Sequence, residues 1–214
     1  MNKVCRWKKF KDKEINESIC QKLEPIIIEE YPWDENGYKP RVEVRFFYTE
    51  SRLCLQFMSY EKEIRAIYKN MNEPVYTDSC VEFFFNPDPD NDDRYFNFEI
   101  NAIGTILLGL GRDRDNRLLV EDVTQDIFNI KSSVDRDKVC EYKDEFWTLE
   151  FSFPYSFIEK YYGKQDFTPG KKIKGNFQKC EDETKFPHYG CWSRISSLEP
   201  DFHRPEYFGH LILD

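Results

Sequence analysis

Hydrophobic and polar residues alternate along much of this chain, and alternation with a period of two predicts β-strands. The clearest example is the stretch 75–104, in which two alternating segments flank an acidic loop. Each segment has one apolar side suited to a core and one side of carboxylates and amides. If the two strands pair, Glu82, Glu99 and Asn101 share a polar surface on one face of the sheet, which suits a polyhydroxylated ligand.

The same alternation continues on both sides of this stretch. It predicts strands at 41–48, 53–59, 80–85, 96–101, 105–110, 146–153, 172–180, 189–195 and 207–213. Pro154 and Gly163 bracket one short helix, and a weaker helical spacing within residues 1–24 stops at Pro25. The charge-dense run 111–117 carries neighbouring residues of opposite sign, which indicates a solvated loop.

Short strands separated by irregular turns, without an internal repeat or a visible linker, are typical of a β-sandwich. The expected fold class is therefore all-β: an antiparallel sandwich of the jelly-roll or immunoglobulin-like kind, with one or two short peripheral helices. At 214 residues the chain is expected to form a single domain, residues 1–214, with a lead-in at 1–40 and the core at 41–214.

Composition narrows the classes of partner. Nineteen Phe, 13 Tyr and four Trp supply more aromatic surface than short strands need, and such rings suit both a core and a surface on which a ligand stacks. Lys and Arg total 31 against 40 Asp and Glu, so the net charge is -9. This charge disfavours nucleic acid and anionic membranes as partners, and no apolar run is long enough to cross a bilayer.

Two features bear on the cellular compartment. The basic N-terminal residues are not followed by an apolar run, which argues against a secretory signal. Seven cysteines, an odd number without a CxxC pair, indicate reduced thiols. A cytoplasmic location is the expectation from the sequence, and secretion is the alternative if an export signal has been removed.

Two groups of residues raise the question of a metal. The acidic loop holds Asp88, Asp90, Asp92 and Asp93. An EF-hand is excluded, because its sixth position requires the glycine that Asp93 replaces and because the flanking segments are strands. The second group consists of Cys180, His188, Cys191 and His203. These residues have no standard zinc spacing, so no metal ligand is assigned and reduced, buried thiols are the simpler interpretation.

Five segments within residues 40–214 carry a resemblance to a known family. They are YTDSCVEFFFNP, YFNFEINAIGT, FWTLEFSFPYS, KGNFQKCED and PDFHRPEYFGHLIL. In this order they resemble the family 9 carbohydrate-binding modules and the wider group of family-9-like sugar-binding domains. The resemblance implies a jelly-roll-like sandwich that does no chemistry and holds a sugar between two aromatic side chains. It allows a structural calcium but no other cofactor, and association with a glycan-degrading enzyme is a further expectation.

The resemblance also points to individual positions. The two aromatic positions match Tyr76 and Phe202, the second lying just before the final strand. The polar positions match Glu82, Glu99 and Asn101. The chain departs from the family in two ways, since smaller rings stand where the family has tryptophans and Glu99 stands where it has a basic residue.

Further candidate ligand-binding residues lie near the last strands. They are Lys179, Trp192 and His203. Each has a structural alternative: Trp192 suits a core, and the two basic residues, like Asp182 and His188 nearby, suit the pinning of loops. The carboxylates Glu82 and Glu99 equally suit cross-strand charge pairs on a solvated face.

The expected function is non-catalytic binding of a mono- or oligosaccharide, with no catalytic residue assigned. The alternative from another class is a glycosidase, since Glu82 and Glu99 on paired strands suit the ~5–5.5 Å carboxyl separation of retaining enzymes. A partner-binding scaffold with a degenerate pocket is the third interpretation. No P-loop and no serine–histidine–acid order supports phosphoryl or acyl transfer.

Overall fold

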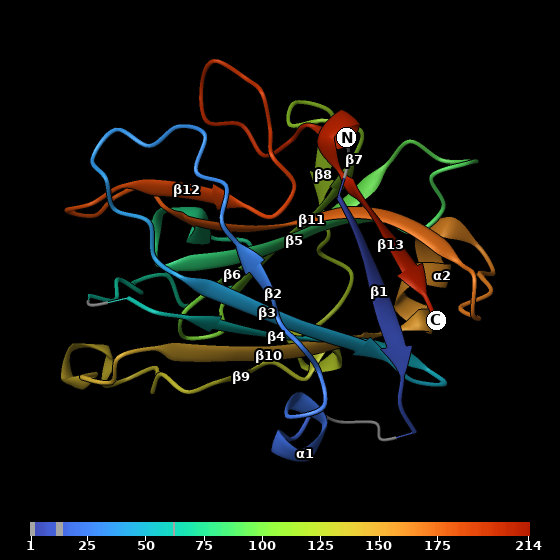
Figure 1. Ribbon diagram of the computed structural model, residues 1–214, viewed down its shortest axis with the longest axis horizontal. Helices are drawn as coiled ribbons and strands as arrows, with labels where there is room; N and C mark the ends of the chain where they lie inside the picture. The colour runs from blue at the N-terminus through green and yellow to red at the C-terminus, as the bar shows by residue number, and fades with distance from the viewer. Residues whose placement is uncertain (1–2, 12–14, 62) are drawn as a thin grey trace.

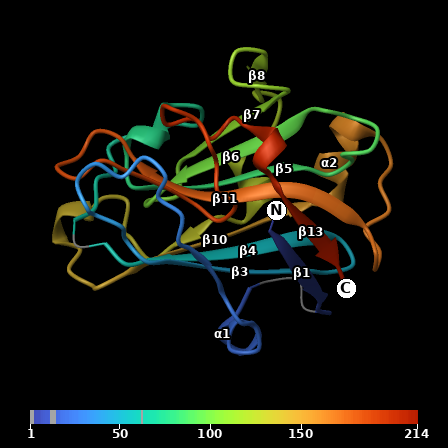
Figure 2. The same ribbon diagram turned by 45° about the horizontal axis from the view of Figure 1, so that its top comes forward.

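The computed structural model describes residues 3–11, 15–61 and 63–214 and consists of two β-sheets packed face to face (Figures 1 and 2). In spatial order the first sheet contains β8 (Arg117–Leu119), β7 (Ile106–Gly111), β6 (Tyr95–Asn101), β5 (Cys80–Asn86), β11 (Lys172–Glu181) and β13 (Gly209–Leu213), with β12 (His188–Cys191) also paired to β11. The second sheet contains β3 (Val42–Tyr48), β4 (Arg52–Ser59), β10 (Trp147–Pro154) and β9 (Lys131–Ser132), with β2 (Ile26–Ile28) paired to β3. The all-β sandwich predicted from the sequence is confirmed.

Strand β1 (Val4–Lys9) joins the two sheets. Its residues 4–7 pair in parallel with β13 and its residues 8–9 in parallel with β3, whereas the other strand pairings are antiparallel. Trp7 is fully buried and lies 4.9 Å, ring centre to ring centre, from Phe46. The sequence did not predict this strand, because three of its six residues are basic. Part of the predicted lead-in, residues 1–2 and 12–14, lies outside the described residues.

The core between the sheets is mainly aromatic. Phe83 of β5 lies 4.9 Å from the ring of Phe177 on β11 and 6.4 Å from that of Phe153 on the opposite sheet. Phe98 of β6 lies 4.9 Å from Phe153 and 5.9 Å from Phe151. Each fully buried ring contributes about 1.5–3 kcal/mol relative to exposure. The aromatic alternation of the sequence therefore forms one core between the layers.

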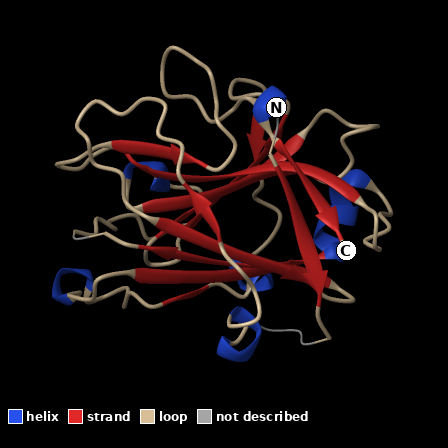
Figure 3. Ribbon diagram, in the orientation of Figure 1, coloured by secondary structure: helices blue, strands red, loops and turns tan. Residues whose placement is uncertain are grey.

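Helices are short and lie at the edges of the sandwich (Figure 3). The α-helices are α1 (Glu17–Cys20) and α2 (Tyr155–Tyr162), and the 3-10 turns are η1 (Val75–Thr77), η2 (Gln125–Phe128), η3 (Val139–Glu141) and η4 (Pro205–Tyr207). The predicted helix after Pro154 is α2, and Gly163 ends it with a positive φ of 71°, a conformation that glycine adopts without strain. Among the described residues no helix has the length and apolarity needed to span a bilayer.

The outer face of the first sheet is covered, whereas the alternation pattern suggested a solvent-facing surface. Every residue of β5 and β6 is buried. Loop residues pack on this face in a second apolar cluster, in which Phe202 and Phe208 meet Phe84 and Tyr95. The polar side chains of the two strands consequently lie beneath loops, and this cover defines the site described next.

Candidate functional site

A cavity of about 510 Å³ lies between the outer face of the first sheet and the loops that cover it. Its floor is formed by Glu82 and Phe84 of β5, Glu99 of β6 and Cys180 of β11. Its walls are formed by Tyr76, Arg114, Arg117, Asp182, Tyr189, Glu199, Pro200, Asp201, Phe202 and His203. Segments far apart in the sequence thus meet over adjacent strands of one sheet.

Glu82 and Glu99 lie directly opposite each other across β5 and β6, and they are only 3% and 2% exposed. Glu82 accepts a hydrogen bond from the Cys180 thiol through Oε1 at 3.0 Å, and its Oε2 has no partner among the described residues. Glu99 Oε1 accepts from Asn97 Nδ2 at 2.8 Å and from Arg117 Nη1 at 3.2 Å. The floor therefore holds one partnered and one largely unpartnered carboxyl group.

Burial is the main reason why the pKa values of both carboxyl groups are raised. It raises the pKa of Glu82 well above its ordinary value, and the neighbouring Glu99 charge raises it further. Burial likewise raises the pKa of Glu99 to about 7, although Arg117 and Asn97 act in the opposite direction. Two facing carboxyls in a desolvated site do not both ionise readily. The pair can therefore offer both a proton donor and acceptors at neutral pH.

His203 is held as a neutral ring above the floor. Its Nδ1 lies 2.8 Å from the Tyr95 hydroxyl, and its Nε2 lies 2.5 Å from Arg117 Nη1. Because a guanidinium only donates, Nε2 is the acceptor and Nδ1 carries the proton. Burial and the Arg117 charge lower the pKa of His203 to about 2. Arg117 therefore links His203 on the wall of the cavity to Glu99 on its floor.

A second arginine fixes the loop that carries Phe202. Arg114 Nη2 donates to Asp201 Oδ1 at 2.9 Å, and the backbone N–H of His203 donates to the same oxygen at 3.1 Å. Arg204 Nε lies 2.7 Å from Asp201 Oδ2. Asp201 consequently joins the 111–117 turn to the 199–204 loop, which closes one side of the cavity.

Two aromatic side chains flank the opening. Tyr76 is 36% exposed. Phe202 is 8% exposed, and its ring centre lies 5.7 Å from that of Trp33 and 6.5 Å from that of Tyr189. Trp33 is itself anchored, since its Nε1 donates to the Ser197 carbonyl at 2.9 Å. Phe202 is therefore held in a fixed position by other rings.

The structure brings together five of the eight residues predicted to bind a ligand. They are Tyr76, Glu82, Glu99, Phe202 and His203. Asn101 lies elsewhere: its Nδ2 donates to Asp78 Oδ2 at 2.9 Å and to the Tyr68 carbonyl at 3.0 Å, and its Oδ1 accepts from the Thr105 N–H at 2.9 Å. These bonds use its amide in holding loops, so it is not part of the cavity surface.

Lys179 and Trp192 also lie away from the cavity. Lys179 is opposite Val81 in the β11–β5 register, so alternation turns it to the inner side of the sheet, where its Nζ lies 2.8 Å from Glu61 Oε1. Trp192 belongs to the main core and lies 5.6 Å from Phe177, ring centre to ring centre. Trp192 is therefore a core residue.

Sequence reasoning missed the two arginines of the cavity. The run 111–117 was interpreted as a solvated loop, but Arg117 begins β8 and both Arg114 and Arg117 line the cavity. The only signal in the sequence was a short apolar pair, Leu118 and Leu119, after the charged run. That pair is too short to distinguish a strand from a loop.

Neither group of residues that raised the question of a metal, the acidic loop or the Cys/His group, is gathered around one point in the structure. In the acidic loop Arg94 pairs with Asp92 and Arg112 with Asp93, so these two carboxylates already have cations and the loop presents no three acidic groups to one ion. A structural calcium there stays a prediction. Across the described residues, the one group of three metal-ligating side chains with donor atoms within 4.8 Å of one another is Cys80, Glu82 and Cys180. All seven cysteines are unbridged.

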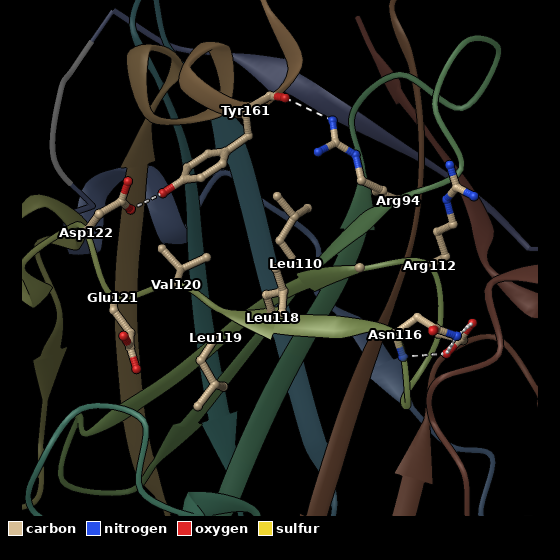
Figure 4. Close-up of a pocket in the computed structure, with 12 residues that line it drawn as sticks. Arg94, Leu110, Arg112, Asn116, Leu118, Leu119, Val120, Glu121, Asp122 and Tyr161 are labelled. Atoms are coloured by element: carbon tan, nitrogen blue, oxygen red, sulfur yellow. Dashed lines mark hydrogen bonds between the residues drawn. The ribbon is translucent and has the colours of Figure 1, made fainter.

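A larger cavity of about 890 Å³ lies between β8 and α2 (Figure 4). Two of its polar contacts lie within the lining: Arg94 Nη2 donates to the Tyr161 carbonyl at 2.9 Å, and the Tyr161 hydroxyl donates to Asp122 Oδ1 at 2.5 Å. Leu118 on its wall is 78% exposed. Among the described residues, no side chain that lines this cavity has a buried polar atom without a partner, so the smaller cavity is the better candidate for a selective ligand.

Comparison with known proteins gives one family and several similar structures. The model of carbohydrate-binding family 9 matches residues 13–213. The crystal structure of a "putative carbohydrate-binding protein" from Bacteroides uniformis is 28% identical, with a TM-score of 0.85 and 100% of both chains covered. A family 9 carbohydrate-binding module from Caldicellulosiruptor kristjanssonii in complex with glucose is 13% identical over 99% of this chain and 96% of that one, with a TM-score of 0.66.

A family 9 carbohydrate-binding module from Caldicellulosiruptor kristjanssonii in complex with cellotriose is 12% identical over 99% of this chain and 93% of that one, also with a TM-score of 0.66. At these identities the Caldicellulosiruptor structures show a shared fold. No protein among the curated sequences matches this chain.

Proposed function

Because this chain belongs to carbohydrate-binding family 9, we propose that the cavity over Glu82 and Glu99 binds a saccharide without chemically changing it. The observation that carries the assignment to this cavity is the position of Tyr76 and Phe202 beside a buried pair of carboxyl groups. A pyranose presents C–H groups on its face and hydroxyls at its edge, so rings and carboxyls together match its surface. The volume suits a small ligand of roughly one or two sugar rings.

Each polar residue has a distinct role in this proposal. The carboxyls of Glu82 and Glu99 receive or donate hydrogen bonds to sugar hydroxyls, and Arg114 supplies donors from the wall. Arg117 orients Glu99 and His203 from behind. A hydrogen bond to a charged group contributes about 1.5–3 kcal/mol when sheltered from water, and ordering costs on association offset much of that gain. We therefore expect affinities that are micromolar or weaker.

The assignment of binding without catalysis rests on the match to carbohydrate-binding family 9. A retaining glycosidase needs one ionised nucleophile and one acid, and Glu82 with its raised pKa and Glu99 with its Arg117 partner are compatible with those two roles. The enzyme alternative is therefore decided by a test of turnover. Association with a glycan-degrading enzyme, and the compartment in which the domain acts, stay predictions.

Isothermal calorimetry tests the proposal. Glucose, cellobiose and cellotriose are the first ligands to use, because the similar Caldicellulosiruptor structures are described with glucose and with cellotriose. We expect saturable binding that Phe202→Ala weakens about tenfold or more. Phe186→Ala is the control for an exposed ring outside the cavity; it matches Tyr76→Ala in exposure, since Phe186 is 41% and Tyr76 is 36% exposed.

Two results would argue against the proposal. The first is an absence of binding to any saccharide at millimolar concentration, on a wider glycan array as well. The second is equal loss of affinity in both phenylalanine variants. Turnover of aryl glycosides that disappears in Glu82→Gln would instead support the enzyme alternative.

A further inference from the structure

At the floor of the cavity two cysteine thiols, which have no role in the proposed sugar binding, lie beside the carboxyl group of Glu82. Cys80 of β5 and Cys180 of β11 are directly opposite each other in the antiparallel register, and Glu82 follows Cys80 two residues later on the same side of β5. The two sulfur atoms and one carboxylate oxygen all lie within 4.8 Å of one another. Three soft or anionic ligand groups thus converge from two adjacent strands.

Burial sets this group apart from an ordinary surface cluster. Cys80 is 0%, Cys180 2% and Glu82 3% exposed. The Cys180 thiol donates to Glu82 Oε1, but Oε2 of Glu82 has no hydrogen-bond partner among the described residues. A buried polar atom without a partner costs about 1–3 kcal/mol, and so it requires an explanation. A bound cation supplies one.

We infer that Cys80, Cys180 and Glu82 form a three-ligand site for Zn²⁺ at the floor of the cavity. Thiolate sulfur and carboxylate oxygen are both established zinc ligands, and thiolates favour zinc over calcium or magnesium. In a tetrahedral site with bonds of about 2.3 Å to sulfur and about 2.0–2.2 Å to oxygen, neighbouring ligand atoms are roughly 3.5–3.8 Å apart. In the structure these donor atoms lie within 4.8 Å of one another, so they must move closer together when the metal binds.

The fourth position of the site faces the cavity. Glu82 and Cys180 line the cavity, so a metal bound between them is accessible to water from that side. Binding forms two zinc–sulfur bonds and one zinc–oxygen bond, and it releases to solvent the proton of each thiol and that of Glu82 where this group is protonated. The metal site shares Glu82 with the proposed sugar site, but the aromatic residues Tyr76 and Phe202 are not metal ligands, so sugar binding can be measured on the metal-free protein.

The experiment uses the whole chain, purified with a thiol-free reductant and stripped of metal with a chelator. Zinc is titrated against a fluorescent competitor, and Co²⁺ is used as a spectroscopic probe for sulfur-to-metal charge transfer. We expect one Zn²⁺ per chain and a charge-transfer band with Co²⁺. Loss of an outer hydrogen-bond partner of a ligand already costs 10–100-fold in affinity, so Cys80→Ser and Cys180→Ser should each weaken zinc binding by about a hundredfold or more.

Matched variants separate a lost ligand from a disturbed fold. Cys54→Ser is the control, because Cys54 is equally buried but lies in a different cluster, and Cys140→Ser controls for an exposed thiol. Both should retain one Zn²⁺. Glu82→Gln preserves the shape of the side chain and should weaken zinc binding while the charge-transfer band with Co²⁺ remains.

Several outcomes would overturn the inference. One is wild-type protein that takes up no zinc although its thiols are shown to be reduced. Another is zinc binding that persists at full affinity in both serine variants. Glucose titrations on the zinc-free protein test the proposed function separately, so either idea can fail without the other.

Discussion

Lys179 and Glu61 form a fully buried ion pair: Nζ of Lys179 lies 2.8 Å from Oε1 of Glu61, and both side chains are 0% exposed. Burial alone would raise the pKa of Glu61, but the Lys179 ammonium and the Ser59 hydroxyl outweigh burial and keep that pKa below its ordinary value. The pair links β11 to the segment that follows β4. It therefore holds the two sheets together at one end of the sandwich.

Removing one member of this pair should destabilise the fold strongly. Lys179→Met leaves the Glu61 carboxylate buried without its cation, which costs about 3–5 kcal/mol. Urea unfolding followed by circular dichroism measures this loss. The double variant Lys179→Met with Glu61→Gln should recover part of it, because no buried charge remains. A change of less than about 1 kcal/mol in the single variant would show that water reaches the pair.

Arg117 should matter for sugar affinity, whereas its neighbour Arg112 should not. Arg117→Met removes the donor to His203 Nε2 and to Glu99 Oε1, so one wall and part of the floor lose their orientation. We expect affinity for the best saccharide to fall about tenfold or more, a loss of roughly 1.4 kcal/mol or greater. Calorimetry measures the affinity of the folded variant.

Arg112→Met is the matched control for Arg117. Arg112 pairs with Asp93 in a bridge whose two side chains are both 68% exposed, and exposed pairs contribute little. Arg117→Lys should recover part of the affinity, because Arg117 makes both bonds through the single nitrogen Nη1 and an ammonium also carries several donors, although on a side chain of different geometry. Full affinity in Arg117→Met would mean that the sugar lies elsewhere.

His188 should make stability fall in acid. Burial and the Lys179 charge lower its pKa to about 4, whereas an unfolded histidine has a pKa near 6.5. Between these values the unfolded chain binds more protons, so stability is present above pH ~6.5 and is lost as the pH falls toward 4. The loss amounts to about 3 kcal/mol at about 1.4 kcal/mol per pKa unit.

Other titrating groups that face His188 also affect how the free energy of unfolding depends on pH. Besides Lys179 they are Glu61 and Glu181, and burial raises the pKa of Glu181 to about 7. Stability from Glu181 is therefore present in acid and lost as the pH rises through 7, opposite to the effect of His188.

The variant His188→Phe keeps a ring beside Tyr38. Its free energy of unfolding should fall less than that of the wild type between pH 6.5 and 4, and parallel curves would refute the assignment.

Gly209 should tolerate no side chain. A Cβ built at this position would lie 2.4 Å from Trp192 Cζ3 and 2.8 Å from the Lys3 carbonyl oxygen. Gly209→Ala is therefore expected to cost about 1–3 kcal/mol of stability through overpacking. Adding Trp192→Leu should cost less than the sum of the two single changes. Sugar affinity measured on the folded variants should be unchanged. A loss of affinity in Trp192→Leu would show that Trp192 contributes to sugar binding.

The strands were predictable where alternation is long. The segments that became β3 to β6 and β10 each hold several apolar residues at every second position, and their pairing placed Glu82 opposite Glu99 as the sequence indicated. Strand β1 was missed because Trp7 and Cys5 are its buried residues among basic neighbours. The position of β1 in the sheets is set by its pairing with β13 and β3, which are distant in sequence. A local sequence pattern contains no information about such pairings.

The site was less predictable than the fold, because loops complete it. Phe202 and Glu99 could be named from the sequence, but the depth of the cavity depends on how residues 111–117 and 199–204 fold over the sheet. Lys179 illustrates the limit on strands: a shift of one position turns a side chain from one face to the other. Arg117 illustrates the limit on loops, where charge alone does not distinguish a solvated residue from one that bridges two buried groups.

The position of β1 also has a mechanical consequence. Val4 lies beside His210 and Trp7 beside Leu213, so the first and last strands run parallel with the two chain ends at opposite ends of the pair. A force that pulls residues 3 and 214 apart therefore acts along the strands and loads their ladder bonds together in shear, rather than peeling them one after another. Strand β1 also pairs with β3, which holds it to the second sheet. Stretching the domain between its ends would therefore begin with the simultaneous rupture of the hydrogen bonds between β1 and β13.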